Sequence, residues 1–422
     1  MTTTTTPPPE ARRTGPDRGD GRSEAATRGD RAAHVPLGVL VSVTALTMIA
    51  PLATDMYVPA FPLVVQDLGT TATSLQLTLT TYFVGMALGQ LLGGPLSDQL
   101  GRRRPLLSAL ALMVVASLGC AVSPTVAALT AARFVQGLAG GWAMVIARSV
   151  VVDLASGPTL VRSLNLVQGV AGVAPVLGPL LGAALLEHSG WRTSFWLLVA
   201  WSAVMIVVVR LVLPETLPTR HRSSGGLRHL RDAGARVLRT RRFTAHLVVM
   251  SLSMGVVFAY VAASAFVLQS MNGLTPTQYS LVFAANAVGL MAATLVSARL
   301  AGRVPTTLVV AVGLAATGAA GVLLLVGAAW FDMPLWAALP GFFVLMTAQG
   351  LIGPNAGALA SGAVPDDPGT GSALLGFVQW STAGLVAPVA GAGGAATAVP
   401  MALMVLAMVL VSAAALRSAT RP

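Results

Sequence analysis

Three ionisable side chains, Asp55, Arg133 and Arg148, lie inside apolar stretches long enough to cross a bilayer. A charged group is costly in lipid, so each is a functional candidate. Asp55 and Arg133 lie about equally deep, each roughly eight residues or 12 Å from the same membrane surface, and we expect them to share one cavity. In that cavity Asp55 would bind and release a proton, while Arg133 favours the release or competes for the carboxylate as a substrate enters. A static ion pair that only fixes helix packing is the alternative, and Arg148 lies near a span end where its side chain can reach water.

A second group of polar residues fills a short loop between the second and third apolar stretches. It reads Gly94-Pro-Leu-Ser-Asp98-Gln-Leu-Gly101-Arg102-Arg103-Arg104-Pro105. Arginine beside a membrane span is retained on the cytoplasmic side, so the cluster marks that face. This topology rule does not require the acidic Asp98, and the glycines on either side of it permit tight turns and close helix approach. We therefore expect this loop to do more than set topology.

The composition of the 422 residues is that of an integral membrane protein, with 55% hydrophobic and only 10% charged residues. Soluble domains carry about a quarter charged residues. All the basic residues are arginine and they gather at the ends of spans, so the net charge of +11 predicts topology and not nucleic-acid binding. The single cysteine, Cys120, and the scattered histidines lack metal-ligand spacing, so we expect no metal and no cofactor. An intramembrane enzyme would need a nucleophile with a base, or histidine and acid ligands, at membrane depth, and none is so placed.

Windows of about 20 apolar residues predict an all-α protein with twelve transmembrane helices. The spans fall at residues 36–61, 75–96, 106–123, 126–153, 161–186, 191–213, 243–269, 277–299, 305–329, 334–360, 370–391 and 395–416. The remaining segments are a disordered cytoplasmic tail at 1–35, a basic cytoplasmic linker at 214–242 and a second tail at 417–422. Both termini are expected in the cytoplasm, because the outer loops contain only one arginine, Arg192.

The two halves of the chain resemble each other. Gln136-Gly-Leu-Ala-Gly140 is matched by Gln349-Gly-Leu-Ile-Gly353, a little over two hundred residues later. Such a repeat predicts two pseudo-symmetric six-helix bundles, 36–213 and 243–416, with a site between them.

The charged machinery is confined to the first half, because Met346 occupies the position that matches Arg133. The second half offers uncharged polar and aromatic side chains, which suit a weakly polar, moderately apolar ligand. The predicted cavity residues are Tyr57, Gln136, Asn286, Gln349 and Trp380. Each of them is also of a kind that packs helices together.

The fifth span combines small residues with prolines, at Gly172, Pro175, Gly178, Pro179 and Gly182. Proline kinks a helix, and glycine lets a neighbouring helix approach closely. This run resembles the motif of the fifth helix in antiporters of the major facilitator superfamily, and the arginine loop resembles the signature loop of that superfamily.

Three segments narrow the resemblance to one branch of the superfamily. They are Leu52-Ala-Thr-Asp55-Met-Tyr57-Val-Pro59 at the end of the first span, and Ala132-Arg133-Phe-Val-Gln136-Gly137 and Ala147-Arg148-Ser-Val-Val-Val-Asp153 in the fourth span. These segments resemble the Bcr/CflA branch of bacterial drug:proton antiporters, which includes amphenicol exporters. The resemblance implies that Asp55 is the coupling acid and Arg133 the cavity arginine. It also implies a cytoplasmic latch in which Asp98 and Arg102 meet Asp153. We place Gly94, Gly101, Arg103 and Arg148 in the same gating loop, where Gln99 departs from the usual basic residue.

The expected function is therefore proton-coupled efflux of a small amphipathic drug, with chloramphenicol or florfenicol as first candidates. A monomer in the bacterial inner membrane would suffice, with drug, proton and lipid as its partners. An exporter or importer of a metabolite, such as a sugar or a biosynthetic product, is the alternative on the same fold, and a non-transporting receptor is a further one. The chain contains no phosphate-binding loop of the Gly-x-x-x-x-Gly-Lys type, so a secondary transporter is expected and not an ATP-driven enzyme.

Overall fold

The structure is a computed structural model that describes residues 35–219, 222, 234–365, 368–393 and 396–420. The described residues form twelve apolar helical spans, which confirms the predicted fold class. The predicted tail at 1–35 lies almost wholly outside the described residues, as does much of the predicted linker.

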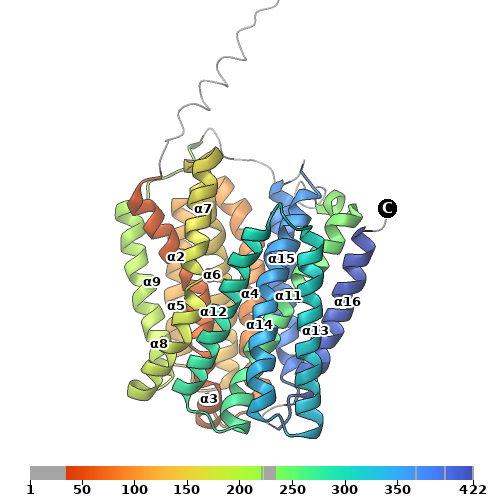
Figure 1. The fold of residues 1–422 in the computed structure, drawn as a ribbon. Coiled ribbons are helices and arrows are strands. Elements are labelled where there is room, and N and C mark those ends of the chain that lie inside the picture. The colour runs from red at the N-terminus through yellow and green to blue at the C-terminus, as the bar shows by residue number, and fades with distance from the viewer. Residues whose placement is uncertain (1–34, 220–221, 223–233, 366–367, 394–395, 421–422) are drawn as a thin grey trace, which may run out of the picture.

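The first six spans form one bundle and the last six form another, side by side in Figure 1. The first bundle contains α2 (Leu37–Asp55) with η1 (Val58–Ala60) and α3 (Phe61–Asp67), α4 (Ala72–Leu100), α5 (Arg103–Ala121), α6 (Val126–Leu154), α7 (Gly157–Ala171) with α8 (Ala174–Ser189), and α9 (Arg192–Val212). The second contains α11 (Arg241–Ala265) with the π-helical η3 (Phe266–Met271), α12 (Pro276–Leu300), α13 (Thr306–Trp330), α14 (Leu335–Gly362), α15 (Pro368–Ala390) and α16 (Val399–Thr420).

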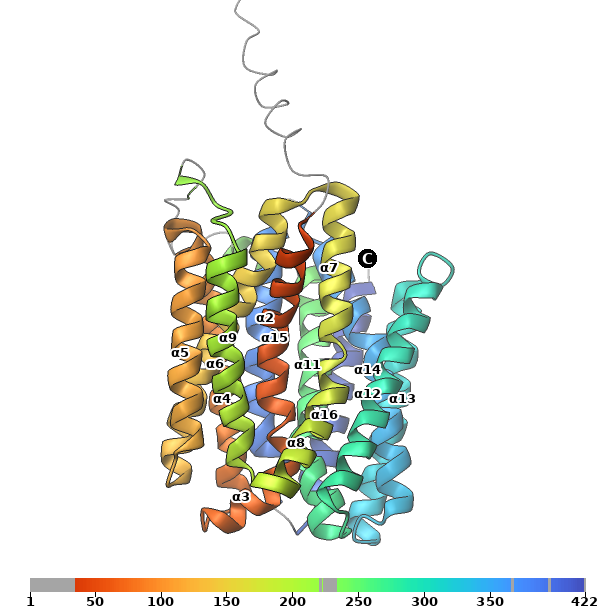
Figure 2. The ribbon, with the colours of Figure 1, turned by 90° about the vertical axis from the view of Figure 1, so that its left-hand side faces the viewer.

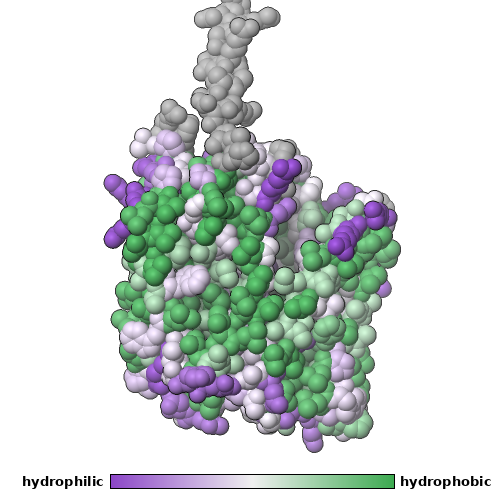
Figure 3. All heavy atoms as spheres, turned by 60° about the vertical axis from the view of Figure 1, so that its left-hand side comes forward, coloured by the Kyte–Doolittle hydropathy of each residue, from purple (hydrophilic) through white to green (hydrophobic). Residues whose placement is uncertain are grey.

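Apolar side chains form a broad band around the middle of the molecule, between two more hydrophilic ends (Figure 3). One end carries the loop between α4 and α5 and the beginning of α2, and we call it the arginine-rich end. The other, called here the opposite end, carries α3 and the loops that follow α5 and α11. The exposed apolar band is the surface that a lipid bilayer covers.

Helices α4 and α6 make the closest contact in the first bundle, and glycine makes it possible. A Cβ atom at Gly137 would lie 1.9 Å from the carbonyl oxygen of Tyr82, and one at Gly85 would lie 2.2 Å from that of Phe134. Without glycine at these places the backbones could not approach so closely. The contact brings the Tyr82 ring beside α6, where Arg133 lies.

The internal repeat appears in the structure as a recurring interhelical hydrogen bond. In the first bundle Gln136 Nε2 of α6 donates to Ser117 Oγ of α5 at 2.8 Å. In the second bundle Gln349 Nε2 of α14 donates to Thr317 Oγ1 of α13 at 3.0 Å. Each glutamine thus ties the fourth span of its bundle to the third, because a polar side chain buried between apolar helices needs a partner there.

Two of the predicted spans are interrupted. Helix α2 ends at Asp55 and α7 ends at Ala171, each four residues before a proline, Pro59 and Pro175. Proline lacks the N–H that would bond to the carbonyl four residues earlier, and its ring clashes with that carbonyl. The first span thus continues past the break through η1 and α3, and the predicted proline kink in the fifth span is seen as the bend between α7 and α8 (Figure 2).

The bundles contact each other through α4 with α15 and through α8 with α12. Five hydrogen bonds between described residues of the two bundles lie toward the opposite end. These are Gln76 to Ala262 O (3.0 Å), Thr73 to Gly391 O (3.3 Å), Gln269 to Pro59 O (3.0 Å), Ser280 to Pro179 O (2.9 Å) and Thr277 to Glu187. At the arginine-rich end the surface is hollowed between the bundles (Figure 3). Among the described residues, the bundles are thus bonded together at the opposite end and separated by a hollow at the arginine-rich end (Figure 3).

The α4–α6 contact makes a prediction about stability. Replacing Gly137 by alanine places a methyl group against the Tyr82 carbonyl, and such overpacking costs about 1–3 kcal/mol, so the melting temperature should fall. Gly169→Ala is the matched control, since a Cβ atom there meets nothing within 4 Å. Cys120, the only cysteine, is fully buried, so its reaction with a thiol-reactive dye during heating reports unfolding. Equal melting temperatures for the two variants would contradict the tight contact.

Candidate functional site

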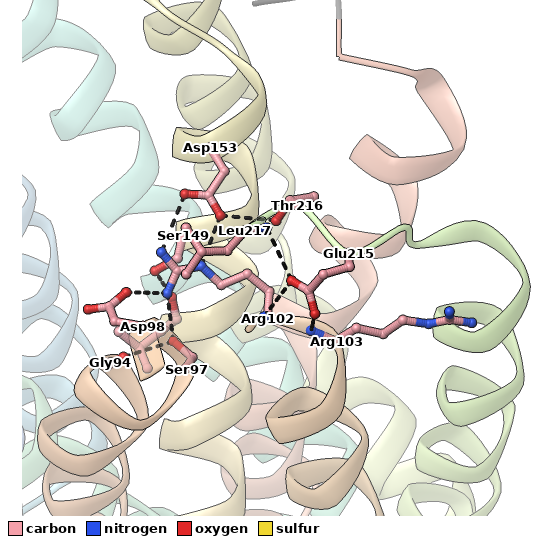
Figure 4. Close-up of polar contacts among 11 residues, drawn as sticks. Gly94, Ser97, Asp98, Arg102, Arg103, Ser149, Asp153, Glu215, Thr216 and Leu217 are labelled. Atoms are coloured by element: carbon pink, nitrogen blue, oxygen red, sulfur yellow. Dashed lines mark hydrogen bonds and ion pairs between the residues drawn. The ribbon is translucent and has the colours of Figure 1, made fainter. Parts of the chain in front are cut away.

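Arg102 connects the last turns of α4 and α6 at the arginine-rich end (Figure 4). Its Nε and Nη2 atoms donate to the two carboxylate oxygens of Asp153 at 2.9 and 3.3 Å. Its Nη1 atom donates to Ser97 Oγ at 2.7 Å and pairs with Asp98. The structure thus brings together Asp98, Arg102 and Asp153, the three charged residues expected in the latch. We call these three residues and Ser97 the Arg102 network. Burial alone would lower the pKa of Arg102, but the hydrogen bonds and charges of Asp153 and Asp98 outweigh burial and raise it, so the guanidinium stays charged.

Glu215 and Thr216, which follow α9, hold this network from outside, and the sequence analysis did not single them out. The carboxylate of Glu215 accepts hydrogen bonds from the backbone N–H groups of Arg102 at 2.7 Å and Arg103 at 3.2 Å. Thr216 Oγ1 donates to Asp153 Oδ2 at 3.0 Å. Glu215 therefore supplies a carboxylate to the first turn of α5, where unpaired N–H groups favour negative charge. An acid directly after a span, in a linker rich in arginine, was the available signal.

The other residues assigned to the gating loop are placed differently. Gly101 has φ 90°, and a Cβ atom there would lie 2.5 Å from the Glu215 carboxylate, so only glycine fits. The carbonyl of Gly94 accepts a 2.8 Å hydrogen bond from Ser97. The side chain of Arg103 points away from the Arg102 network toward α9, where it donates to the Arg210 carbonyl. Arg148 is exposed on α6 and joins none of the described contacts of the network.

Asp55 lies at the break after α2 and is only 6% exposed. One of its carboxylate oxygens accepts a hydrogen bond from Thr54 Oγ1 at 3.2 Å. Gly178 of α8 packs directly against it, since a Cβ atom there would lie 2.7 Å from Asp55 Cβ. No described basic side chain forms an ion pair with it. The short η1 that follows Asp55 contacts α11 and α12 of the second bundle, so this acid lies close to where the bundles meet.

Arg133 is fully buried, and no described acid pairs with it. Its Nη1 atom donates to the Ala53 carbonyl at 2.9 Å and to Gln136 Oε1 at 2.6 Å. The guanidinium lies over the ring of Tyr82, with its carbon Cζ 4.2 Å from the ring centroid, and near the rings of Tyr57 at 5.2 Å and Phe195 at 5.8 Å. Aromatic faces thus take the place of a counter-ion.

The two charged residues are therefore neighbours without being partners. Arg133 bonds to the carbonyl two residues before Asp55, so both side chains approach the same break in α2. The static ion pair considered as an alternative is not formed. The Nε and Nη2 atoms of Arg133 are buried and make no hydrogen bond to the described residues, so the guanidinium keeps two donors for another acceptor.

The five predicted cavity residues are spread over both bundles. Gln136 and Gln349 make the interhelical bonds described above, Asn286 Nδ2 donates to Tyr260 Oη at 2.9 Å, and Tyr57 is 1% exposed. Trp380 of α15 stacks on Phe83 of α4, with ring centroids 5.6 Å apart, and so bridges the bundles. Helix packing explains the observed contacts of Gln136 and Gln349. Asn286, Tyr57 and Trp380 are the remaining candidates for the lining of a substrate cavity.

The glycines and prolines of the fifth span lie at the break between α7 and α8 and along α8, which contacts α2 in its own bundle and α12 in the second bundle. Gly182 packs on the Met56 backbone, with a virtual Cβ only 2.2 Å from its carbonyl oxygen, one turn from the contact of Gly178 with Asp55. The Pro179 carbonyl accepts the hydrogen bond from Ser280 of α12. Pro175 lies in the first turn of α8, and Gly172 lies in the turn between α7 and α8. The kinked helix thus joins the Asp55 region to the second bundle.

Comparison with known proteins identifies the family. Residues 43–388 match the Major Facilitator Superfamily. The chain belongs to this superfamily. It is 32% identical over 372 residues to the uncharacterized MFS-type transporter YdgK of Bacillus subtilis (strain 168), covering 87% of this chain and 92% of YdgK.

Two further relatives of this Major Facilitator Superfamily protein carry names that refer to drug resistance. The bicyclomycin resistance protein homolog of Haemophilus influenzae is 26% identical over 373 residues, covering 88% of this chain and 94% of that protein. The multidrug resistance protein MdtL of Escherichia fergusonii is 28% identical over 248 residues, covering 59% of this chain and 62% of MdtL.

Solved structures show the same Major Facilitator Superfamily fold. A bacterial homologue of the human lysosomal transporter Spinster, in an inward-facing and unoccupied conformation, matches with a TM-score of 0.72 and 15% identity, covering 90% of this chain and 95% of that one. The nucleoside transporter NupG matches with a TM-score of 0.72 and 12% identity, covering 91% and 100%. The match to the Major Facilitator Superfamily and the twelve apolar spans of the described residues identify the chain as a multi-pass membrane transporter.

The Arg102 network makes a prediction about local stability. Lysine in place of Arg102 keeps the charge but offers a single ammonium, which cannot reach Ser97, Asp98 and both oxygens of Asp153 together. Arg102→Lys should therefore accelerate amide hydrogen exchange around residues 97–103, by about tenfold for a loss of about 1.4 kcal/mol. Arg148→Lys, on the exposed face of α6, should leave that exchange unchanged. Equal exchange in the two variants would show that the bridge does not stabilise this end.

Proposed function

We propose that this protein exports small amphipathic drugs across the bacterial plasma membrane in exchange for protons. The observation that carries the proposal is Asp55, a buried acid close to where the bundles meet, with one side-chain hydrogen bond and no described basic partner. A carboxylate without a counter-ion is costly at membrane depth, and binding a proton removes that cost. Water that reaches Asp55 first from one side of the membrane and then from the other would let its carboxyl bind a proton on one side and release it on the other.

Arg133 supports the second half of this cycle. Its charge lies beside the α2 break without neutralising Asp55, and two of its donors are unoccupied by described residues. A drug with a carbonyl, hydroxyl or nitro oxygen offers an acceptor for those donors, and the surrounding aromatic rings offer apolar contact. The substrate would thus bind at Arg133 and the proton at the adjacent Asp55, so the binding of one would displace the other.

The arginine distribution supports an orientation with both termini in the cytoplasm. Arg102, Arg103, Arg162 and Arg303 lie at one end, whereas Arg192 lies at the other and pairs with Asp67. In that orientation the open arginine-rich end faces the cytoplasm, where a drug destined for export would enter. The Arg102 network would then steady the ends of α4 and α6 beside the entrance while the bundles rock.

The proton gradient is sufficient for such transport. One charge that crosses 100 mV yields about 2.3 kcal/mol, enough for roughly a fifty-fold gradient of a neutral drug per proton. The names of the bicyclomycin resistance homologue and of MdtL support a drug as substrate. We take chloramphenicol and florfenicol as the first compounds to test, with a monomer as the working unit.

Drug accumulation tests the proposal directly. In an efflux-deficient host, cells that express the wild-type protein should accumulate less chloramphenicol or florfenicol than control cells, and a protonophore should abolish the difference. Asp55→Asn should accumulate drug at the control level, because the amide cannot carry the proton. Asp67→Asn is the matched control, since that acid is exposed in an ion pair with Arg192 and should retain export.

The outcomes separate substrate from coupling. No effect of the wild-type protein on either amphenicol or on a wider drug panel would favour the metabolite transporter. Export that survives in Asp55→Asn and still collapses with the protonophore would move the coupling proton to another group. Export that is insensitive to the protonophore would contradict proton coupling altogether.

Arg133 gives a second prediction for the same assay. Arg133→Lys keeps a positive charge, but the ammonium cannot lie flat over Tyr82 while it donates to Ala53 and Gln136. Export should fall by tenfold or more, an energy of about 1.4 kcal/mol or above. Arg192→Lys is the control at the exposed Asp67 pair and should keep near-normal export. Wild-type export by Arg133→Lys would mean that charge alone matters at this position.

A further inference from the structure

A cavity of about 500 Å³ lies at the arginine-rich end, beside the beginning of α5 and the chain that follows α9. It is lined by Arg103, Arg104, Leu107, Glu215, Thr219 and Arg222. Figure 4 shows the Arg103 side chain extending away from the Arg102 network, toward α9. The cavity shares none of the residues around Asp55, and it adjoins the latch on the side of α9, where Glu215 both lines the cavity and bonds to the Arg102 backbone.

The positive charge of this cavity is not neutralised by its one acid. Glu215 forms no ion pair with the described arginines, because its oxygens accept backbone N–H groups from Arg102, Arg103 and Leu217. The Nε atoms of Arg103 and Arg222 are buried and make no hydrogen bond to described residues. A buried donor without an acceptor is costly, and two guanidinium groups with free donors match the oxygens of a phosphate.

The cavity also lies at the level of a lipid headgroup. The membrane span of α5 begins at Arg103, so Leu107 is one turn inside the apolar region. Leu211 of the adjoining helix α9 is 81% exposed, as expected for a side chain that contacts acyl chains. A phosphate among the arginines would thus leave its glycerol and acyl chains directed along Leu107 and the surface of α9.

We propose that this cavity binds the phosphate group of an anionic phospholipid. Phosphate is the shared chemistry, and the position of Leu107 and the exposed apolar surface of α9 make a lipid the source. Because Glu215 lines the cavity and also bonds to the first turn of α5, a bound headgroup fastens the chain after α9 to the Arg102 network. Anionic lipid in the leaflet at the arginine-rich end then stabilises this end of the first bundle.

Lipid titration of the purified full-length protein tests the proposal, with unfolding followed through Cys120. Phosphatidylglycerol should raise the melting temperature in detergent, whereas phosphatidylcholine with the same acyl chains and sodium phosphate at millimolar concentration should not. The variant Arg103→Gln, Arg104→Gln, Arg222→Gln should need about a hundredfold more phosphatidylglycerol for the same shift, at about 1 kcal/mol for each arginine.

The matched control removes three exposed arginines at the same end that do not line the cavity, as Arg162→Gln, Arg299→Gln, Arg303→Gln. It should change the half-maximal lipid concentration by less than about fivefold. If the cavity triple variant does not fold, Arg104→Gln alone serves as the test, because that side chain is exposed and has no described bond. This single variant should need about fivefold more phosphatidylglycerol for the same rise in melting temperature. Equal lipid dependence of the cavity and control variants would overturn the site. Equal stabilisation by phosphate or by phosphatidylcholine would overturn an anionic lipid as its ligand.

Discussion

The burial of one permanent positive charge organises the first bundle. Arg133 cannot lose its charge, so the helices around it must supply what water would otherwise provide. Glycines in α4 and α6 bring the Tyr82 ring under the guanidinium. The break after Asp55 supplies a carbonyl: the Tyr57 N–H bonds to Thr54 O instead of Ala53 O, which leaves Ala53 O for Arg133. The close helix contact, the helix break and the buried cation are thus one arrangement.

That arrangement explains why Asp55 is left without a basic partner. The guanidinium is already engaged with a carbonyl, a glutamine and aromatic rings, so among the described residues the nearby carboxyl accepts a hydrogen bond from Thr54 and packs on Gly178. At the arginine-rich end the charges are arranged in the opposite way, because Arg102 has two acids and a hydroxyl within one bundle. The same residue types therefore fix a helix junction in one place and leave a buried acid without a described basic partner in another.

Much of this architecture follows from the sequence, because length and apolarity determine which segments cross a membrane. The twelve spans and the meeting of Asp98, Arg102 and Asp153 were predicted from pattern and resemblance. Equal depth predicted that Asp55 and Arg133 would be near, but depth along a helix does not fix the direction of a side chain, so the sequence left open whether the two form an ion pair. The roles of Gln136 and Gln349 could not be settled either, since a buried amide between helices and one in a cavity have the same sequence signal. The hydrogen bonds of Glu215 depend on how the chain after α9 folds back, which no local pattern encodes.

The closed opposite end has a consequence for how this protein can vary in evolution. Among the described residues, four interbundle hydrogen bonds at this end run from a neutral side chain to a backbone carbonyl, at Ala262, Gly391, Pro59 and Pro179. Every amino acid carries that acceptor, so the accepting segments can exchange side chains while the bonds persist. The selective constraint therefore falls on the few donor residues and on the glycines that let them approach. Homologues can diversify the walls of the transport pathway without losing the ability to shut it.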